Sequence, residues 1–449
     1  MNFIFRHTKL KDWLIALVMI LGVYGLCFEV SQASFLSILL YWVPFGLAYA
    51  WLVFFGRRNL ETNFCFYLLL AFSLKVIALF SFPLLSDDIY RFYWDGLLWT
   101  NGINPLEQLP AFYIQNGISV NGLTPQLYSE LNSPEYFTIY PPVLQSFFAF
   151  AASLGNSVED VALIMKTILL ILEIGTIFLV IGILRMLKLS VSRVFWYALN
   201  PLVIIEIMGN LHFEGAMVFF MALFIWLILK MKWMGSALAL AFSVGSKLLP
   251  LMFIPAILKY LDWKRGWKWM LIFCLGFLVL IIPFLDGGLI QNFGQSFDLY
   301  FRKFEFNASL YYLLREIGIW VTGYNQIAIL GPSLAILTTI SIALLALKIK
   351  KGDERSLLEI LLISFCIYLL GSATVHPWYI ILPVFLSVFT RFQFPLVWSL
   401  VVVLSYAHYW DGVYEEKYLL IFLEYCIVLF YFLFEHLKKE RLPKKYSAD

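Results

Sequence analysis

Three aspartates and one arginine stand within nine positions of an otherwise apolar chain, directly after a hydrophobic run: Asp87, Asp88, Arg91 and Asp95. If a helix begins at Asp88, then Asp88, Arg91 and Asp95 share one face, because positions i, i+3 and i+7 align. The helix N-terminus would favour the ionised form of Asp87 and Asp88. Two fixed carboxylates can serve as a general base or as ligands for a cation. A solvated helix cap is the simpler alternative.

Other polar candidates stand at the ends of apolar runs. His212 and Glu214, in NLHFEG, could bind a donor phosphate, a divalent metal or acceptor hydroxyls, or they could form a polar turn. Lys247 lies in the apolar stretch SVGSKLLPL, where a lone ammonium needs a partner such as a lipid-linked phosphate, unless it extends to an interface. Arg302 and His376 are the remaining candidates for a phosphate, and an interfacial histidine with satisfied hydrogen bonds is the alternative for His376.

The composition places the chain in a membrane. Of its 449 residues, 62% are hydrophobic and 14% charged, which no soluble globular protein matches. The net charge of +3 is too small to suggest nucleic acid. Five scattered cysteines show no paired spacing, so they predict neither a disulfide framework nor a zinc site. The apolar run after the basic N-terminus lacks a small-residue cleavage site, so we expect it to be retained as the first span.

The apolar runs predict an all-α bundle of about 11 to 14 membrane helices in a single domain, 1–449. The first three spans, at 12–28, 35–56 and 64–83, have basic residues at the ends expected to face the cytoplasm. This orientation puts the acidic pair outside the cell, on an interfacial helix at the membrane surface. Two loops should share that face, 84–138 and 286–325.

Two apolar stretches are too short or too interrupted for ordinary spans. The run 141–154 is expected to be a re-entrant or tilted half-helix, because a full crossing would place the next basic cluster on the wrong side. The region 233–260 is interrupted near Lys247 while both its flanks are basic, so two half-length passes should meet there. The second break brings Lys247 into the apolar region, where ionisable residues usually have a function.

The form DDIYRFYWDG with GINP resembles polytopic glycosyltransferases of the GT-C class, in the bacterial mannosyltransferase-like branch that uses polyprenyl-phosphate sugars. The motif YPP with Tyr140, NLHFEG, the lysine before a Leu-Pro run and HPWY continue the resemblance over 86–379. Leu106 stands where the family tends to have Tyr, and Glu214 where it more often has Asp. The resemblance implies that one of Asp87 and Asp88 is the catalytic base or a metal ligand.

The resulting hypothesis is transfer of a hexose, by family resemblance mannose, from a polyprenyl-phosphate sugar to a glycan or glycolipid of the cell envelope. Asp87 or Asp88 would be the base, and the other would bind sugar hydroxyls or a divalent cation (Mg²⁺ or Mn²⁺), with Asp88 as the metal ligand considered. Arg91, Asp95, Tyr140, His212, Glu214, Lys247, Arg302 and His376 would bind substrate. The site would face outward from the bacterial inner membrane. A transporter or flippase of a lipid-linked sugar is the alternative.

Overall fold

The computed structural model describes residues 7–285, 288, 291–292, 294–295 and 304–440, and of 438–440 it describes the backbone alone. Within these ranges the chain is helical, with one isolated bridge between Phe306 and Thr374 as its β pairing. The prediction of an all-α fold is confirmed. Arg302 and about a third of the expected loop 286–325 lie outside the described residues.

The first half of the chain builds one side of the bundle and the structure above it. Its helices are α1 (Leu10–Tyr24), α2 (Phe35–Ala50), α3 (Arg57–Thr62), α4 (Phe64–Leu79), α5 (Asp88–Thr100), α6 (Pro110–Gln115), α7 (Pro125–Ser129), α8 (Pro142–Leu154), α9 (Val158–Met186), α10 (Val194–Ala198), α11 (Pro201–Val203) and α12 (Glu214–Leu229). Three π-helical segments follow α1, α2 and α11, namely η1 (Gly25–Glu29), η2 (Trp51–Phe55) and η4 (Ile204–Gly209).

The second half completes the bundle. Its α-helices are α13 (Trp233–Ser246), α14 (Ile254–Tyr260), α15 (Trp263–Ile281), α17 (Leu310–Thr322), α18 (Ile327–Ala346), α19 (Glu354–Gly371), α20 (Ile381–Ser387), α21 (Phe394–Val401) and α22 (Tyr418–Glu440). Short 3-10 segments join several of them: η5 (Leu249–Phe253), η6 (Ile282–Phe284), η7 (Pro377–Ile380) and η8 (Val402–Gly412). A further 3-10 segment, η3 (Val191–Arg193), lies between α9 and α10 in the first half.

Six of the described helices are long and apolar enough to cross a membrane, and a seventh span arises if the pair bent by 55° at 199–200 counts as one. Six further apolar helices have 10–17 residues. The chain is therefore a polytopic membrane protein. Its described residues hold enough apolar helices for the expected 11 to 14, although six or seven of them have full spanning length.

The two expected interruptions are present. Helix α8 has 13 residues, a length of about 20 Å against a hydrocarbon core of about 30 Å. Helix α13 ends at Ser246 and η5 begins at Leu249, so the chain breaks at Lys247. The half-helix at 141–154 and the break near Lys247 both correspond to the prediction.

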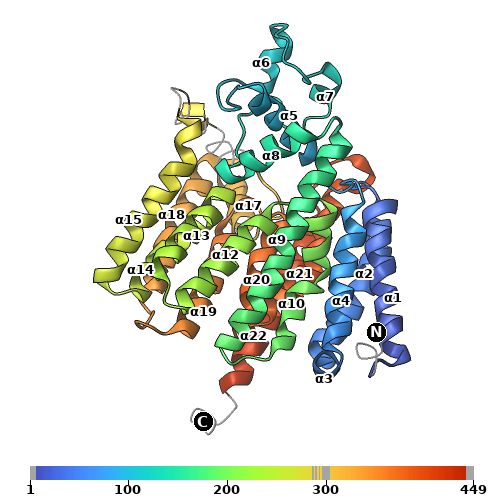
Figure 1. Ribbon diagram of the computed structural model, residues 1–449, viewed down its shortest axis with the longest axis vertical. Helices are drawn as coiled ribbons and strands as arrows, with labels where there is room; N and C mark the ends of the chain where they lie inside the picture. The colour runs from blue at the N-terminus through green and yellow to red at the C-terminus, as the bar shows by residue number, and fades with distance from the viewer. Residues whose placement is uncertain (1–6, 286–287, 289–290, 293, 296–303, 441–449) are drawn as a thin grey trace.

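Helix α5 differs from the surface helix that its sequence suggested. In Figure 1 it lies at the top of the molecule, above the bundle, with α6 and α7 over it and α8 beside it. Most of its residues are buried, including the charged residues Arg91 and Asp95, while Asp88 at its start is partly accessible. Gly96 permits the close packing, because a Cβ there would lie 2.5 Å from the carbonyl oxygen of Phe148 in α8. Trp94, Leu97 and Leu98 of α5 are buried against α6 and α7, and we call these two short helices the cap. Burial under the cap therefore holds α5.

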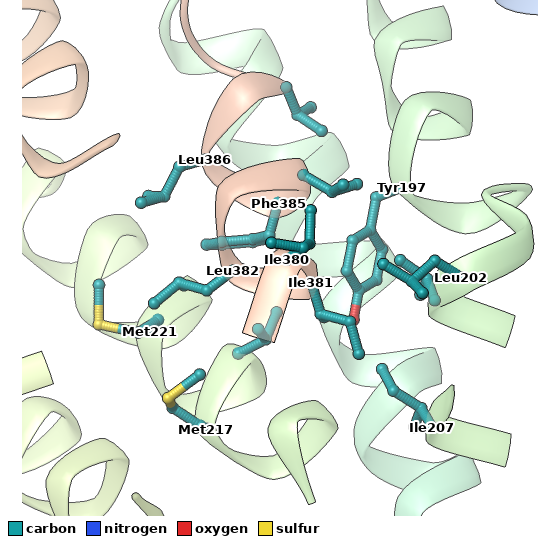
Figure 2. Close-up of a cluster of buried hydrophobic side chains, with 14 of the residues drawn as sticks. Tyr197, Leu202, Ile207, Met217, Met221, Ile380, Ile381, Leu382, Phe385 and Leu386 are labelled. Atoms are coloured by element: carbon teal, nitrogen blue, oxygen red, sulfur yellow. The ribbon is translucent and has the colours of Figure 1, made fainter. Parts of the chain in front are cut away.

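The apolar core brings distant segments of the chain together beneath the cap. Figure 2 shows Ile381, Leu382 and Phe385 of α20 between Tyr197 and Leu202 on one side and Met217 and Met221 on the other. These side chains are fully or almost fully buried. Since α20 directly follows η7, this packing fixes the start of η7 near the start of α12.

A buried ion pair crosses the core between α4 and α9. The Lys75 ammonium lies 3.0 Å from the Glu173 carboxylate, and both side chains are inaccessible to solvent. The second oxygen of Glu173 accepts a hydrogen bond of 2.6 Å from the hydroxyl of Tyr197. Removing one partner of such a pair leaves an uncompensated charge in a medium of low polarity.

We predict that Lys75→Met lowers the free energy of unfolding by about 3–5 kcal/mol, because it leaves Glu173 buried without its cation. Thermal unfolding in detergent measures the change. The double variant Lys75→Met/Glu173→Leu is the control and should regain most of the lost stability, because no charge then remains buried. A single variant that unfolds at the wild-type temperature would contradict the prediction.

Candidate functional site

A cavity of about 750 Å³ lies under the cap, where the ends of distant helices meet. Most of the residues selected from the sequence line it: Asp87, Asp88, Arg91, Tyr140, His212, Glu214, Lys247 and His376. Asp95 is buried outside the cavity wall, and Arg302 lies outside the described residues. Eight residues separated by up to almost 290 positions in sequence thus converge on one space.

The acidic pair stands at the start of α5, as the sequence suggested. Asp87 is the N-cap residue and Asp88 the first helical residue, but the Asp87 side chain accepts no capping hydrogen bond. Instead, the amide nitrogen of Asn132 donates to both carboxylates, at 2.7 Å to Asp87 and 2.9 Å to Asp88. One side-chain amide from the loop after α7 therefore orients both acids.

The pKa of Asp87 is shifted in the direction opposite to the one expected at a helix N-terminus. Burial and then the neighbouring charge of Asp88 raise the pKa of Asp87, while the hydrogen bond from Asn132 opposes the shift. The expectation that the helix end alone favours ionisation was therefore wrong for Asp87. A carboxyl group with a raised pKa is better matched to taking up a proton near neutral pH.

Arg91 and Asp95 form an internal support for the acidic pair. The Arg91 Nε lies 2.9 Å from Asp95, and Nη1 donates to the carbonyl oxygens of Ser133 and Tyr136 at 3.0 and 2.9 Å. Gln145 donates to the other oxygen of Asp95. Arg91 therefore ties the loop that carries Asn132 to α5, while Asp95 faces α8 rather than the cavity.

The path of the chain before His212 is unusual. Asn200 caps α11 by accepting from the N–H groups of residues 202 and 203, and the helix then widens into the π-helix η4. Leu211 adopts a positive φ of 64°, which is rare for a residue with a Cβ. The turn returns His212 over Glu206, and π-helical turns and strained residues of this kind concentrate at functional sites.

His212 is held on two sides. Its Nδ1 lies 2.9 Å from Glu206, and its ring stacks on the indole of Trp378 with centroids 3.8 Å apart. Its Nε2 faces Asp88 at 3.9 Å, which is too long for a hydrogen bond. Tyr406 donates a hydrogen bond of 2.7 Å to Glu206 from the opposite side.

Lys247 has a protein partner. Its ammonium pairs with the carboxylate of Glu214 and lies 4.5 Å from the ring centroid of Tyr379. The expectation that the Lys247 ammonium stands alone was wrong, because Glu214 at the start of α12 faces the break after α13. The contact of Lys247 with a lipid-linked phosphate stays a prediction. About a quarter of the Lys247 side chain remains exposed, at 27%. An anion in the cavity can therefore still reach it.

His376 lies in the loop before η7, between two aromatic rings. Trp378 stacks on it at 4.4 Å with an interplanar angle of 4°, and Phe306 stacks at 4.7 Å. Burial lowers the pKa of His376 well below its usual value, and the Lys247 and His212 side chains lower it further. His376 therefore faces the cavity as a neutral imidazole, able to donate one hydrogen bond but not to supply a positive charge.

Tyr140 forms part of the aromatic wall next to the acids. Its ring packs edge-on against Phe92 at 4.9 Å and Phe148 at 5.4 Å. The cavity then continues into an apolar arm between η5 and helices α18 and α19, lined by Leu249, Leu251, Met252, Ala335, Ile342 and Tyr368. Leu251 is 37% exposed, so this arm reaches the surface of the bundle. A polar end and an apolar end thus share one space.

Few protein groups near Asp87 and Asp88 could serve as ligands of a metal ion. In the described parts of the chain no three His, Cys, Asp or Glu side chains are grouped as ligands. The oxygens of Asp87 and Asp88 converge on one point, which the Asn132 amide occupies. Mg²⁺ can be held by two carboxylates if water and substrate phosphate complete its shell. Asp87 and Asp88 fit such an ion only with these additional ligands.

Three residues at the site were not selected from the sequence: Asn132, Glu206 and Trp378. Glu206 was detectable, because an acid within the apolar run PLVIIEIMG is costly unless it has a partner. Trp378 belongs to the HPWY motif, but nothing in that motif shows that it stacks between two histidines. Asn132 stands in a polar loop without periodicity, where no pattern distinguishes it.

The bundle and its acid-lined cavity define a polytopic membrane protein with a polar site at one end of its spans. Residues 18–261 match a family profile described as alpha-(1->6)-mannopyranosyltransferase, N-terminal domain, and because the match covers more than half of the chain, the chain belongs to this family. It is therefore a glycosyltransferase. Among curated proteins no match was found. The matched range includes the acidic pair, His212, Glu214 and Lys247.

We predict that two substitutions move the Asp87 pKa in opposite directions. Asp88→Asn should lower it by removing a like charge, and Asn132→Ala should raise it by removing a hydrogen bond to the ionised form. Carboxyl ¹³C NMR titration of the aspartates measures both shifts. The exposed Asp262 is an internal reference whose titration should not change. Shifts of the same sign in the two variants would refute this account of the pair.

Proposed function

We propose that the protein transfers a mannosyl group from a polyprenyl-phosphate donor to a glycan or glycolipid acceptor of the cell envelope. The observation that carries the proposal is the single cavity that joins the acidic pair to an apolar arm reaching the surface of the bundle. A lipid-linked sugar has these two parts, a polar head and an isoprenoid tail. The family of the chain supports mannose as the sugar.

The two ends of the cavity fit the two ends of this donor. Apolar side chains of η5, α18 and α19 would contact the isoprenoid, so burial of apolar surface would contribute to donor binding. At the junction with the polar end, Lys247 offers a charge to the phosphate and His376 offers a neutral N–H. Glu214 would keep Lys247 in place between turnovers.

In the proposed reaction Asp87 is the base. An acceptor hydroxyl loses its proton to Asp87 as its oxygen bonds to the anomeric carbon, and the bond from that carbon to the polyprenyl phosphate breaks. Lys247 and His376 stabilise the charge on the departing phosphate. A single displacement inverts the anomeric configuration and needs no second nucleophilic carboxylate. Asp88 does not act as the base in this reaction and instead contacts hydroxyl groups of the sugar.

We propose further that the site faces away from the cytoplasm in the bacterial inner membrane. The Arg57–Thr62 helix α3, which begins with two arginines, lies at the bottom of Figure 1 together with the C-terminal end of α22. Helix α5 with the acidic pair lies at the opposite end. Positive residues favour the cytoplasmic side, which supports an outward-facing acidic pair.

A divalent cation at Asp88 stays a prediction. If one binds, Asp87 and Asp88 would hold it together with phosphate oxygens and water, and it would add positive charge next to the leaving group. No step above requires it. Treatment with EDTA followed by addition of Mg²⁺ or Mn²⁺ in the transfer assay tests the prediction.

We expect Asp87→Asn to reduce kcat by about 10²–10⁴-fold, the usual contribution of a general base, without changing thermal stability. Wild-type turnover should rise with pH through the raised Asp87 pKa, because the base acts in its ionised form. Radiolabel transfer in detergent measures both effects. Asp262→Asn, which changes an exposed helix cap outside the cavity, is the matched control. The assignment of Asp87 as the base fails if Asp87→Asn keeps near wild-type turnover.

The donor class is tested by incubating purified protein with radiolabelled polyprenyl-phosphate sugars and with soluble nucleotide sugars. We expect transfer from a polyprenyl-phosphate mannose and none from the nucleotide sugars, because the apolar arm contributes binding energy only with a lipid tail. Bulky substitution in the arm, Ala335→Trp, should raise the KM of the lipid donor by at least about tenfold. Transfer from nucleotide sugars alone would overturn the donor proposal.

A further inference from the structure

A buried carboxylate outside the proposed mechanism lies directly behind the cavity. Glu206 belongs to η4, and its side chain has no accessible surface. Three side chains converge on it: the Tyr406 hydroxyl at 2.7 Å, the Asn210 amide nitrogen at 3.1 Å and His212 Nδ1 at 2.9 Å. The backbone N–H of His212 also donates to the backbone oxygen of Glu206 at 2.9 Å. This amount of ordering around one side chain requires a physical reason.

The three contacts determine which ring nitrogen of His212 holds the hydrogen. One oxygen of Glu206 accepts from Tyr406, and the other accepts from Asn210 and faces His212 Nδ1. Two lone pairs at 2.9 Å would repel, so Nδ1 carries the hydrogen and donates it. In the neutral imidazole Nε2 then carries a lone pair and is an acceptor. The side chain of Glu206 thus decides what His212 presents to the cavity.

The Nε2 side of the His212 ring faces the carboxylate of Asp88, which is also a hydrogen-bond acceptor. Its buried Nε2 makes no hydrogen bond among the described residues, and it lies 3.9 Å from Asp88 Oδ2. At this distance the two atoms make no hydrogen bond, so neither satisfies the other. Trp378 holds the ring plane by stacking, so the imidazole cannot easily turn away. The cavity therefore ends at two fixed acceptors that need hydrogen donors.

We propose that His212 Nε2 and Asp88 accept hydrogen bonds from two neighbouring hydroxyls of the transferred sugar, and that Glu206 is the positioning residue that makes His212 an acceptor. This inference rests on the proposed sugar transfer. The substrate class that it predicts is sugars that carry free hydroxyls on two adjacent carbons facing His212 and Asp88. A sugar that lacks one of them leaves a buried acceptor unpaired, and such sites discriminate strongly.

Donor analogues test the sugar contact. With polyprenyl-phosphate mannose and its monodeoxy forms as probes, the wild-type enzyme should show kcat/KM at least about tenfold lower for two adjacent deoxy positions than for the parent donor. A uniform response to all deoxy positions, or strong losses at two non-adjacent positions, would overturn the proposal. The ratio of kcat/KM values does not depend on the fraction of protein that is folded.

Substitutions at Glu206 test the positioning role. Glu206→Met removes the acceptor for the Nδ1–H of His212. At one of the two adjacent positions, the ratio of kcat/KM for the parent donor to kcat/KM for the deoxy donor should then fall below about threefold. Glu206→Gln keeps an oxygen toward His212 and should retain the discrimination. Glu424→Met is the control, because Glu424 is also a buried carboxylate with two hydrogen-bond donors, yet lies outside the cavity lining. Unchanged discrimination in Glu206→Met would refute the role.

A spectroscopic measurement separates this inference from the transfer reaction itself. ¹⁵N NMR of histidine-labelled wild-type protein, with His212 assigned by comparison with His212→Gln, should show a protonated Nδ1 and an unprotonated Nε2. A protonated Nε2 would overturn the inference even if transfer is observed. If no donor is transferred by the wild-type protein but the expected nitrogen pattern is seen, the proposed function fails while the tautomer stands.

Discussion

A carboxylate inside a bundle surrounded by lipid is stable only when hydrogen-bond donors or a cation accompany it, and this requirement shapes the structure at every level. The buried acids of the described residues each have such partners: Asp12 with Asn59 and Tyr67, Asp95 with Arg91, Glu173 with Lys75, Glu206 with His212, Glu214 with Lys247, and Glu424 with Trp398 and Asn307. Most of these pairs join segments far apart in the chain. They therefore act as fixed cross-links between helices whose apolar surfaces alone would allow sliding.

The acidic pair at the start of α5 is the exception, and it makes one end of the cavity acidic. Among the described residues, Asp87 and Asp88 have no lysine or arginine within ion-pairing distance, and the neutral amide of Asn132 serves both. Their negative charge is thus left to face the cavity. A sugar carbon that gains positive character as its bond to phosphate breaks would be stabilised there.

The neighbouring polar groups are held by aromatic rings and by the break in the helices. Trp378 lies between His212 and His376, so a single indole fixes both imidazoles. Lys247 reaches the cavity because α13 stops one residue before it. A transporter would be expected to carry its charges in paired broken helices near the middle of the membrane. Membership in a mannosyltransferase family instead identifies the protein as an enzyme.

The sequence by itself determined the helical, polytopic fold and the interruptions at 141–154 and Lys247, because hydrophobicity and run length act locally. It also indicated eight of the residues around the cavity, because ionisable residues are conspicuous in an apolar chain and Tyr140 belongs to a motif of the family resemblance. The tertiary structure alone decided their partners: Glu214 for Lys247, Asn132 for the acids, and Glu206 and Trp378 for His212. It also reversed the expected effect on the Asp87 pKa, because burial and a neighbouring charge outweigh the helix end. Glu206 is only six residues from His212 and meets it through the π-helix η4 and the turn at Leu211. The other partners come from segments that are remote in sequence, and the packing of the helices, which no local pattern encodes, brings them together.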